Sequence, residues 1–384
     1  MAQERIKYLD GLRGLAAMLI ILHHYALAFL PGVFSKAAGT YHLPGSGELW
    51  LYNTPLKLPL AGIVWLFVFL ILSGWVMTWT FIQMGRRRQH LIRSSINRYF
   101  RLVGPVVATG GLIWLALKLN LAFNQKAAEI SRSWFWLGTM WRFEPNFLIM
   151  LKQSLVEVYF KIIPMETVYN SSLWVVPFFF LGSFLLMAVL ALAAWQPRWR
   201  WLIYGISLIL LIKTWYFSLL IGVILAERVS LKSKISWSKS WQIGLFLGFI
   251  YFGTYPSWTD KTLMAGSWYD FLPQVNLANQ AMFYPALGAT LLLILLMGSP
   301  RLQNMLSQSI WIGLGRISYS LYIVHLLIIN TLASFILVAA SPWLPYPLIL
   351  ILILGLCLPL TLALAYGLYR TTEVRAIKIN WPKV

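Results

Sequence analysis

Long apolar runs recur along this chain, and they constrain its fold more than any other feature. Residues 15–22, for example, read "LAAMLIIL". Runs of roughly 17–25 mainly apolar residues are long enough for a helix to cross a bilayer. The chain therefore predicts an all-α fold, a polytopic bundle of transmembrane helices.

We predict about ten spans and a single membrane domain over residues 1–384, with no second soluble domain. Residues 200–226 leave two alternatives open. They form either one long tilted helix with Lys213 near its middle or two short spans with Lys213 at the turn, which fits the charges better. The longest connection, 123–172, is predicted to face outward and to include a re-entrant or interfacial piece. The predicted spans are 11–30, 60–83, 102–122, 173–195, 200–212, 214–226, 241–256, 281–298, 310–338 and 346–369.

The charge distribution indicates how the helices are oriented. Only 11% of the residues are charged, yet the formal net charge is +20, whereas soluble domains carry about 25% charged residues. The basic residues lie in short loops between apolar runs, as the positive-inside rule describes. We therefore expect both termini in the cytoplasm, membrane lipids as partners and no nucleic-acid partner. The expected location is the cell membrane, with several crossings.

The single cysteine, Cys357, excludes an intrachain disulfide. No cluster of cysteine and histidine has the spacing of metal ligands, so no metal site is expected. The N-terminus resembles a signal peptide in composition. Asp10, Arg13 and two histidines fit that interpretation poorly, and an uncleaved first membrane helix is expected.

A line of polar residues follows one face of the first predicted helix. Arg13 and His24 are eleven residues apart, about 1100° of rotation and within roughly 20° of three full turns. Asp10 precedes Arg13 by three residues and is its neighbour on the helix surface. Arg13 can instead extend to lipid headgroups, and the histidines can bond to other helices. A polar line that ends at histidine favours function, because imidazole takes up protons near neutral pH.

A second polar group lies in "GRISYSLYIVH", residues 315–325. Three of its members are at i, i+4 and i+7 and so share one helix face. Hydrogen bonding between helices is the competing explanation, and for this segment alone it is the better one. The polar residues of the segment are Arg316, Ser318, Ser320, Tyr322 and His325.

Two arginines, Arg98 and Arg101, stand where the third predicted helix enters the lipid. Guanidinium groups at i and i+3 on one face can hold a phosphate or pyrophosphate, although a plain positive-inside loop explains the arginines before them. The sequence "FLILSGW" around Ser73 is more typical of close helix packing than of a serine nucleophile.

These motifs, taken in order, resemble the acyltransferase 3 family of integral membrane acyltransferases. The family's first helix has Arg or Lys, ten residues and then His, as Arg13 and His24 do here. Its "F-x-L-S-G" helix is similar to "FLILSGW", and its arginine segment before a proline is similar to Arg98, Arg101 and Pro105. The family's "GRISYSLYLVH" signature is nearly verbatim at 315–325.

The resemblance implies transfer of an acyl group, commonly acetyl from acetyl-CoA, to a hydroxyl of a cell-surface or exported carbohydrate or of a lipid. Acyl-CoA would be a donor substrate, and no bound cofactor is implied. His24 would be the general base. Arg98 and Arg101 would hold the donor's phosphates with Arg13, beside Asp10. The residues that would line or brace the same cavity are Arg316, Ser318, Ser320, Tyr322 and His325.

One departure from the family pattern favours a second interpretation. Relatives often read "LW-x-x-P-x-E-F-x-G-S", whereas this chain reads "LWVVPFFFLGS", with Phe179 in place of the glutamate. Asp10 is then the only acidic residue expected at a span core, about 21 Å along the helix from His24. Glu157 or Glu166 of the outer connection could supply a carboxylate. The alternative function is a proton-coupled or catalytically impaired membrane carrier on the same scaffold.

Overall fold

The computed structural model describes residues 6–35, 39–43, 47–86, 88–231, 235–256, 267–272 and 280–375. All regular secondary structure within these ranges is helical, so the predicted all-α class is confirmed. Both chain ends, which we predict to be cytoplasmic, lie outside the described residues. The same is true of Arg87 in the basic loop.

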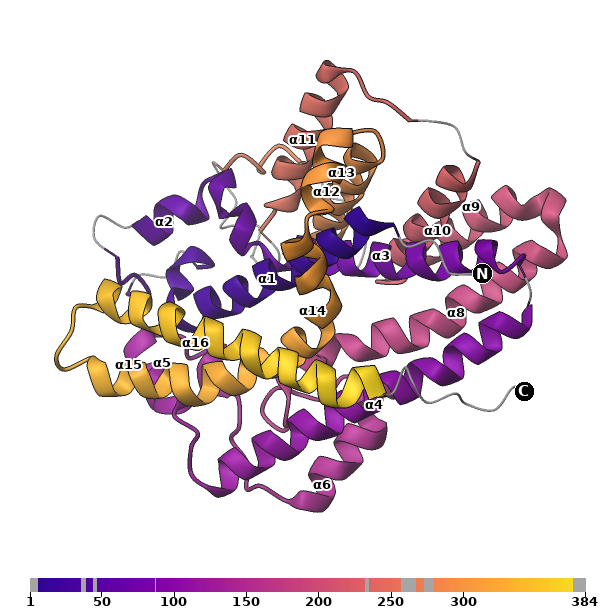
Figure 1. Ribbon diagram of the computed structural model, residues 1–384. Coiled ribbons are helices and arrows are strands. Elements are labelled where there is room, and N and C mark those ends of the chain that lie inside the picture. Colours follow the sequence, from indigo (N-terminus) through magenta and orange to yellow (C-terminus); the bar gives the residue numbers. More distant parts are fainter. Residues whose placement is uncertain are drawn as a thin grey trace.

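Sixteen α-helices form the described part of the chain (Figure 1). Their bounds are α1 Lys7–Phe29, α2 Gly47–Tyr52, α3 Gly62–Gln83, α4 Arg88–Lys118, α5 Asn124–Ser131, α6 Phe147–Lys152, α7 Val158–Phe160, α8 Val176–Trp195, α9 Arg200–Leu211, α10 Phe217–Ser230, α11 Lys239–Gly253, α12 Gln280–Met297, α13 Pro300–Leu306, α14 Ser309–Ile328, α15 Ser334–Ala340 and α16 Tyr346–Leu368. Three π-helical turns extend them: Gln153–Glu157 between α6 and α7, Ile329–Ala333 between α14 and α15, and Tyr369–Glu373 after α16.

Six helical segments among the described residues are long and apolar enough to cross a bilayer. A seventh is possible if α12 and α13, which meet at an angle of 101°, form one broken span. These segments coincide with predicted spans, but the number ten stays a prediction. The six segments are Lys7–Phe29, Gly62–Gln83, Asn97–Lys118, Ser171–Trp195, Ser309–Ala340 and Tyr346–Glu373.

The remaining predicted spans are also helical but shorter. The helices α9, α10 and α11 have 12, 14 and 15 residues, fewer than the roughly 17–25 that a single crossing needs. Lys213 lies in the turn between α9 and α10. The break at Lys213 therefore agrees with the second alternative for 200–226, while the crossing of the membrane by two short spans stays a prediction.

The helices α1 and α14 pack closely because glycines face each other across their contact. A Cβ atom on Gly315 would overlap the Asp10 carbonyl oxygen, and one on Gly14 would overlap the Trp311 carbonyl oxygen. Small residues at such a crossing let two membrane helices approach backbone to backbone. This contact fixes the two helices on which most of the predicted site residues lie.

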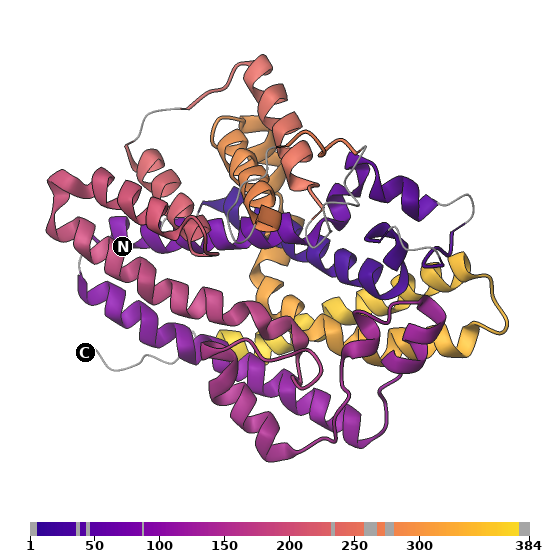
Figure 2. The same cartoon turned by 180° about the vertical axis from the view of Figure 1, so that it is seen from behind.

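The long connection 123–172, which we predict to face outward, folds back against α4. Phe147 at the start of α6 contacts Trp114, with ring centroids 5.2 Å apart, and the Leu155 carbonyl accepts a hydrogen bond from Tyr99. Trp114 and Tyr99 are fifteen residues apart on α4, about 22 Å along the helix. Residues 147–160 thus run along α4, and their placement as a re-entrant or interfacial piece stays a prediction. In Figure 2, seen from the opposite side, α4 and α8 lie side by side in front of α16.

Candidate active site

The centre of the candidate site is a pair of histidines, His24 on α1 and His325 on α14. Nδ1 of His24 and Nε2 of His325 are 2.8 Å apart, a hydrogen-bond distance. The two rings are nearly parallel, with centroids 4.8 Å apart. The sequence predicted both residues as parts of one site, and the close contact of α1 with α14 brings them together.

The two histidines differ in accessibility. His325 is fully buried, with 0% of its surface exposed, whereas His24 is half-buried. The Trp136 ring stacks on His24 with centroids 5.3 Å apart, so His24 lies between an indole and the second imidazole. His24 is therefore the member of the pair that a substrate can reach.

His23, the neighbour of His24, has a separate environment. Its Nδ1 is 2.6 Å from the Leu60 carbonyl oxygen just before α3. Phe34 contacts the ring edge to face, and Gly62 at the start of α3 leaves room for it. His23 thus joins α1 to α3, while His24 faces α14.

Three arginines form a cationic cluster where α1, α4 and α14 meet. Arg13 lies 3.6 Å from Asp10, one turn earlier on α1. Arg98 donates a 2.9 Å hydrogen bond to the Ser73 hydroxyl on α3. Arg13 and Arg101 are both close enough to Arg98 to act on its charge. The arginine cluster, Arg13, Arg98 and Arg101, thus brings together three residues for which the family resemblance implies one role.

Ser73 fits the packing interpretation of its motif. A Cβ atom on Gly74 would overlap the Leu219 carbonyl oxygen, and one on Gly222 would overlap that of Ile71. These glycines let α3 and α10 touch backbone to backbone. The Ser73 hydroxyl holds Arg98, an orienting contact.

The residues of "GRISYSLYIVH" have different surroundings. Ser318 bonds to the Gly315 carbonyl of its own helix, 2.9 Å away. Tyr322 donates a 2.8 Å hydrogen bond to the Ser172 carbonyl before α8, and Ser320 donates to Glu373 at 2.5 Å. Arg316 is exposed. Tyr322 and Ser320 therefore brace the helix that carries His325, whereas neither Ser318 nor Arg316 forms a hydrogen bond with either histidine in the described part of the chain.

The expectation that Asp10 is the only acidic residue at a span core is wrong. Glu373 lies in the last spanning segment and is 1% exposed. Glu48 and Glu227 are likewise buried. Neither carboxylate proposed from the outer connection supports His24, since Glu157 pairs with Lys152 and Lys161 and Glu166 is exposed.

Glu227 belongs to an ion network away from the histidines. Both its oxygens accept 2.8 Å hydrogen bonds from Arg86, and Tyr204 donates to it at 2.9 Å. Burial alone would raise the pKa of this carboxyl. The hydrogen bonds from Arg86 and Tyr204, with the charges of Arg86 and Arg200, outweigh burial and hold the pKa below its usual value. The network joins the end of α3 to α9 and α10.

Phe179, which stands at the position of the family's glutamate, is half-buried against the apolar core of the helix bundle. No ring contact joins Phe179 to either histidine in the described part of the chain. Within that same part of the chain, no group of three or more potential ligands could hold a metal ion.

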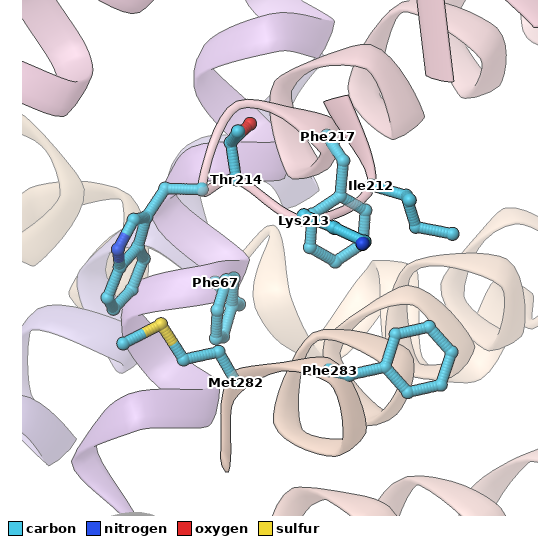
Figure 3. A pocket seen from close by; sticks show the side chains of 8 residues that line it. Phe67, Ile212, Lys213, Thr214, Phe217, Met282 and Phe283 are labelled. Atoms are coloured by element: carbon cyan, nitrogen blue, oxygen red, sulfur yellow. The ribbon is translucent and has the colours of Figure 1, made fainter. Parts of the chain in front are cut away.

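A small pocket lies at the turn between α9 and α10 (Figure 3). Phe67, Trp215, Met282 and Phe283 surround it, with Lys213 at the turn. None of the predicted site residues lines it. It is a separate feature from the histidine pair.

A family model described as an acyltransferase domain, that of acyltransferase 3, matches residues 6–364. No match was found among curated proteins or among solved structures. The matched range includes all the predicted site residues, from Asp10 to His325, and ends before Glu373.

Proposed function

The chain belongs to the acyltransferase 3 family of membrane acyltransferases, and on this basis we propose that it moves an acyl group, most simply acetyl, from acyl-CoA to a hydroxyl. The acceptor is a cell-surface or exported carbohydrate or a lipid. The observation that carries the proposal is the 2.8 Å contact between half-buried His24 and fully buried His325.

The surroundings of His325 favour one arrangement of protons on the pair. Its buried Nδ1 has no hydrogen bond of good geometry. The backbone carbonyl groups of Leu321 and Tyr322 are nevertheless close enough to interact with this ring. A proton on that Nδ1 would face these carbonyls and leave Nε2 as an acceptor. His24 would then donate through Nδ1, which leaves its Nε2 lone pair free to act as a base.

The proposed reaction uses that lone pair. His24 Nε2 takes the proton from the acceptor hydroxyl as the oxygen attacks the thioester carbonyl. The carbon–sulfur bond then breaks, and the proton passes from His24 to the leaving CoA thiolate. The products are an ester and CoA. His325 stabilises the positive charge on His24 by accepting its Nδ1–H hydrogen bond throughout.

The spacing between the arginine cluster and His24 suits a pantetheine thioester. Arg13 and His24 are separated by eleven residues, about 16 Å along a helix. The pantetheine arm has a backbone comparable in length to about four amino-acid residues, or roughly 14 Å when extended. Phosphates held by the arginine cluster would thus place the thioester near His24. This agreement supports acyl-CoA as the donor.

The direct test is release of CoA from acetyl-CoA by the purified protein in detergent, with and without added acceptors. The proposal predicts release that depends on His24. If no release occurs and no acetyl group is transferred, the proposed reaction is wrong. The acceptor can be identified by mass spectrometry of surface glycans and lipids from cells with and without the protein, as an added acyl mass.

The carrier alternative rests on Phe179. A glutamate is expected at this position in relatives, and a scaffold that lacks it could move protons or a solute without acyl transfer. Substitution Phe179→Glu distinguishes these cases when the parent is inactive. Transfer gained by Phe179→Glu supports an impaired acyltransferase, whereas solute uptake driven by a proton gradient supports a carrier.

A further inference from the structure

Glu373 is a buried carboxylate at the end of α16, and it is held in place. Its side chain is 1% exposed and accepts a 2.5 Å hydrogen bond from Ser320, which is itself fully buried. A carboxyl group in such a place either takes up a proton or has a partner of opposite charge. Nearby cationic groups would keep Glu373 charged.

The cationic neighbours of Glu373 are members of the arginine cluster. Arg101 and Arg13 are the arginines whose charges act on its carboxylate. Packing agrees with this, because a Cβ atom on Gly104, three residues after Arg101, would lie 3.8 Å from the Cβ of Thr372. In addition, Tyr319 beside Ser320 bonds to the Leu102 carbonyl. The end of α16, α4 and α14 thus meet around Glu373.

We infer that Glu373 is a positioning residue that holds the arginine cluster ready to bind the phosphates of the donor. The identity of the donor rests on the proposed function, whereas the phosphate site itself does not depend on it. Three guanidinium groups gathered in one place repel one another. A single fixed carboxylate offsets part of that repulsion and gives Arg13 and Arg101 a common direction.

Loss of the carboxylate should release Arg101 first. Arg98 is tied to Ser73 and Arg13 to Asp10, whereas the Arg101 side chain is exposed and can turn to solvent. The opposite effect is conceivable, because a fixed negative charge also repels phosphate. We expect orientation to dominate, because Ser320 holds the carboxylate on the protein side of the cluster.

The test compares binding of CoA and of inorganic pyrophosphate to the full-length protein in detergent. Glu373→Gln keeps the shape of the side chain and removes its charge. It should weaken binding of both probes on the order of tenfold, as typical for partners that orient a ligand-binding group. Turnover at saturating donor should change much less than the KM for the donor. The double variant that combines Glu373→Gln with Arg101→Ala should lose little more affinity for the two probes than Arg101→Ala alone.

Two further variants serve as controls. Glu227→Gln removes an equally buried carboxylate from the network of Arg86 and should leave binding of both probes unchanged. Ser320→Ala keeps the charge of Glu373 but frees it, and should weaken binding by a smaller factor. It also provides a measurement if Glu373→Gln does not fold.

Several results would overturn the inference. Folded Glu373→Gln that binds both probes as tightly as the parent, or more tightly, contradicts it, and so does an equal loss in Glu227→Gln. If the parent binds pyrophosphate but not CoA, the donor assignment is wrong. The role of Glu373 is then tested by comparing pyrophosphate binding in the parent and in Glu373→Gln. If the parent binds neither probe, the phosphate site and the role of Glu373 are both wrong.

Discussion

His24 and His325 are 301 residues apart in the chain, yet Nδ1 of the first and Nε2 of the second are 2.8 Å apart. Their helices reach this contact because glycines let α1 and α14 approach closely on the side of Asp10. Two imidazoles at this distance share one proton in their hydrogen bond. In the proposed arrangement of protons, the buried ring therefore sets which nitrogen of the accessible ring is basic.

Substitution of His325 should reduce transfer through its effect on His24. In His325→Gln the expected loss in kcat is about 10–100-fold, part of what a positioned base contributes, with little change in the KM for the donor. The double variant with His24→Gln should be no slower than His24→Gln alone, since residues that act as a unit are not additive. Independent, multiplicative losses would show that the two histidines have separate roles.

The arginine cluster should determine donor affinity. Arg98→Ala and Arg101→Ala each remove a charge-assisted phosphate contact worth about 1.5–3 kcal/mol. The dissociation constant for CoA should thus rise at least tenfold in each variant, as measured by titration of purified protein. Arg198→Ala, which changes an exposed arginine in the turn between α8 and α9, is the matched control. If all three variants bind CoA with equal affinity, the arginines serve only to orient the helices in the membrane.

The contact between α1 and α14 can be tested at two glycines of the same helix. Gly315→Ala places a methyl group on the Asp10 carbonyl oxygen, whereas Gly313 has nothing within 4 Å of an added Cβ. Overpacking of this kind costs roughly 1–3 kcal/mol. Thermal unfolding in detergent should therefore show a lower midpoint for Gly315→Ala than for Gly313→Ala. Identical midpoints would mean that the helices are not in contact there.

The network around Glu227 should make stability depend on pH. Its pKa is lower in the folded protein than in the unfolded chain, where a glutamate titrates near about 4.3. The network therefore stabilises the fold fully above that pH and loses its effect as the pH falls through the lower folded-state pKa. Glu227→Gln should unfold at a lower temperature at pH 7, with the difference shrinking in acid. A difference that is constant with pH would contradict the ion-pair explanation.

Much of the fold could be predicted because apolar runs and charged turns are local signals. Lys213 interrupts an apolar stretch, and the chain does break there between α9 and α10. The number of crossings could not be predicted in the same way. An apolar helix of 12–15 residues, such as α9 or α11, has the composition of a span without its length, and only the three-dimensional packing reveals where it ends.

Residue spacing showed which site residues share one helix, whereas only the family resemblance indicated which of them meet across helices. The spacing of eleven residues alone placed His24 on the same helix face as Arg13. Glu373 was overlooked because its surroundings, "YRTTEVR", look like a cytoplasmic end. Its burial depends on a π-helical turn that carries the chain back to Ser320. No periodic pattern in the sequence encodes such a turn.

The central claim is that His24 is the base, and its most direct test is acyl transfer by His24→Gln. Glutamine keeps a polar side chain in the bundle but cannot take up a proton near neutral pH. At equal amounts of folded, donor-binding protein, the account predicts a rate lower by about 10²–10⁴-fold. His23→Gln, which loses only the contact of its ring with Leu60 and Phe34, should stay close to the parent. Full transfer by His24→Gln would contradict the account.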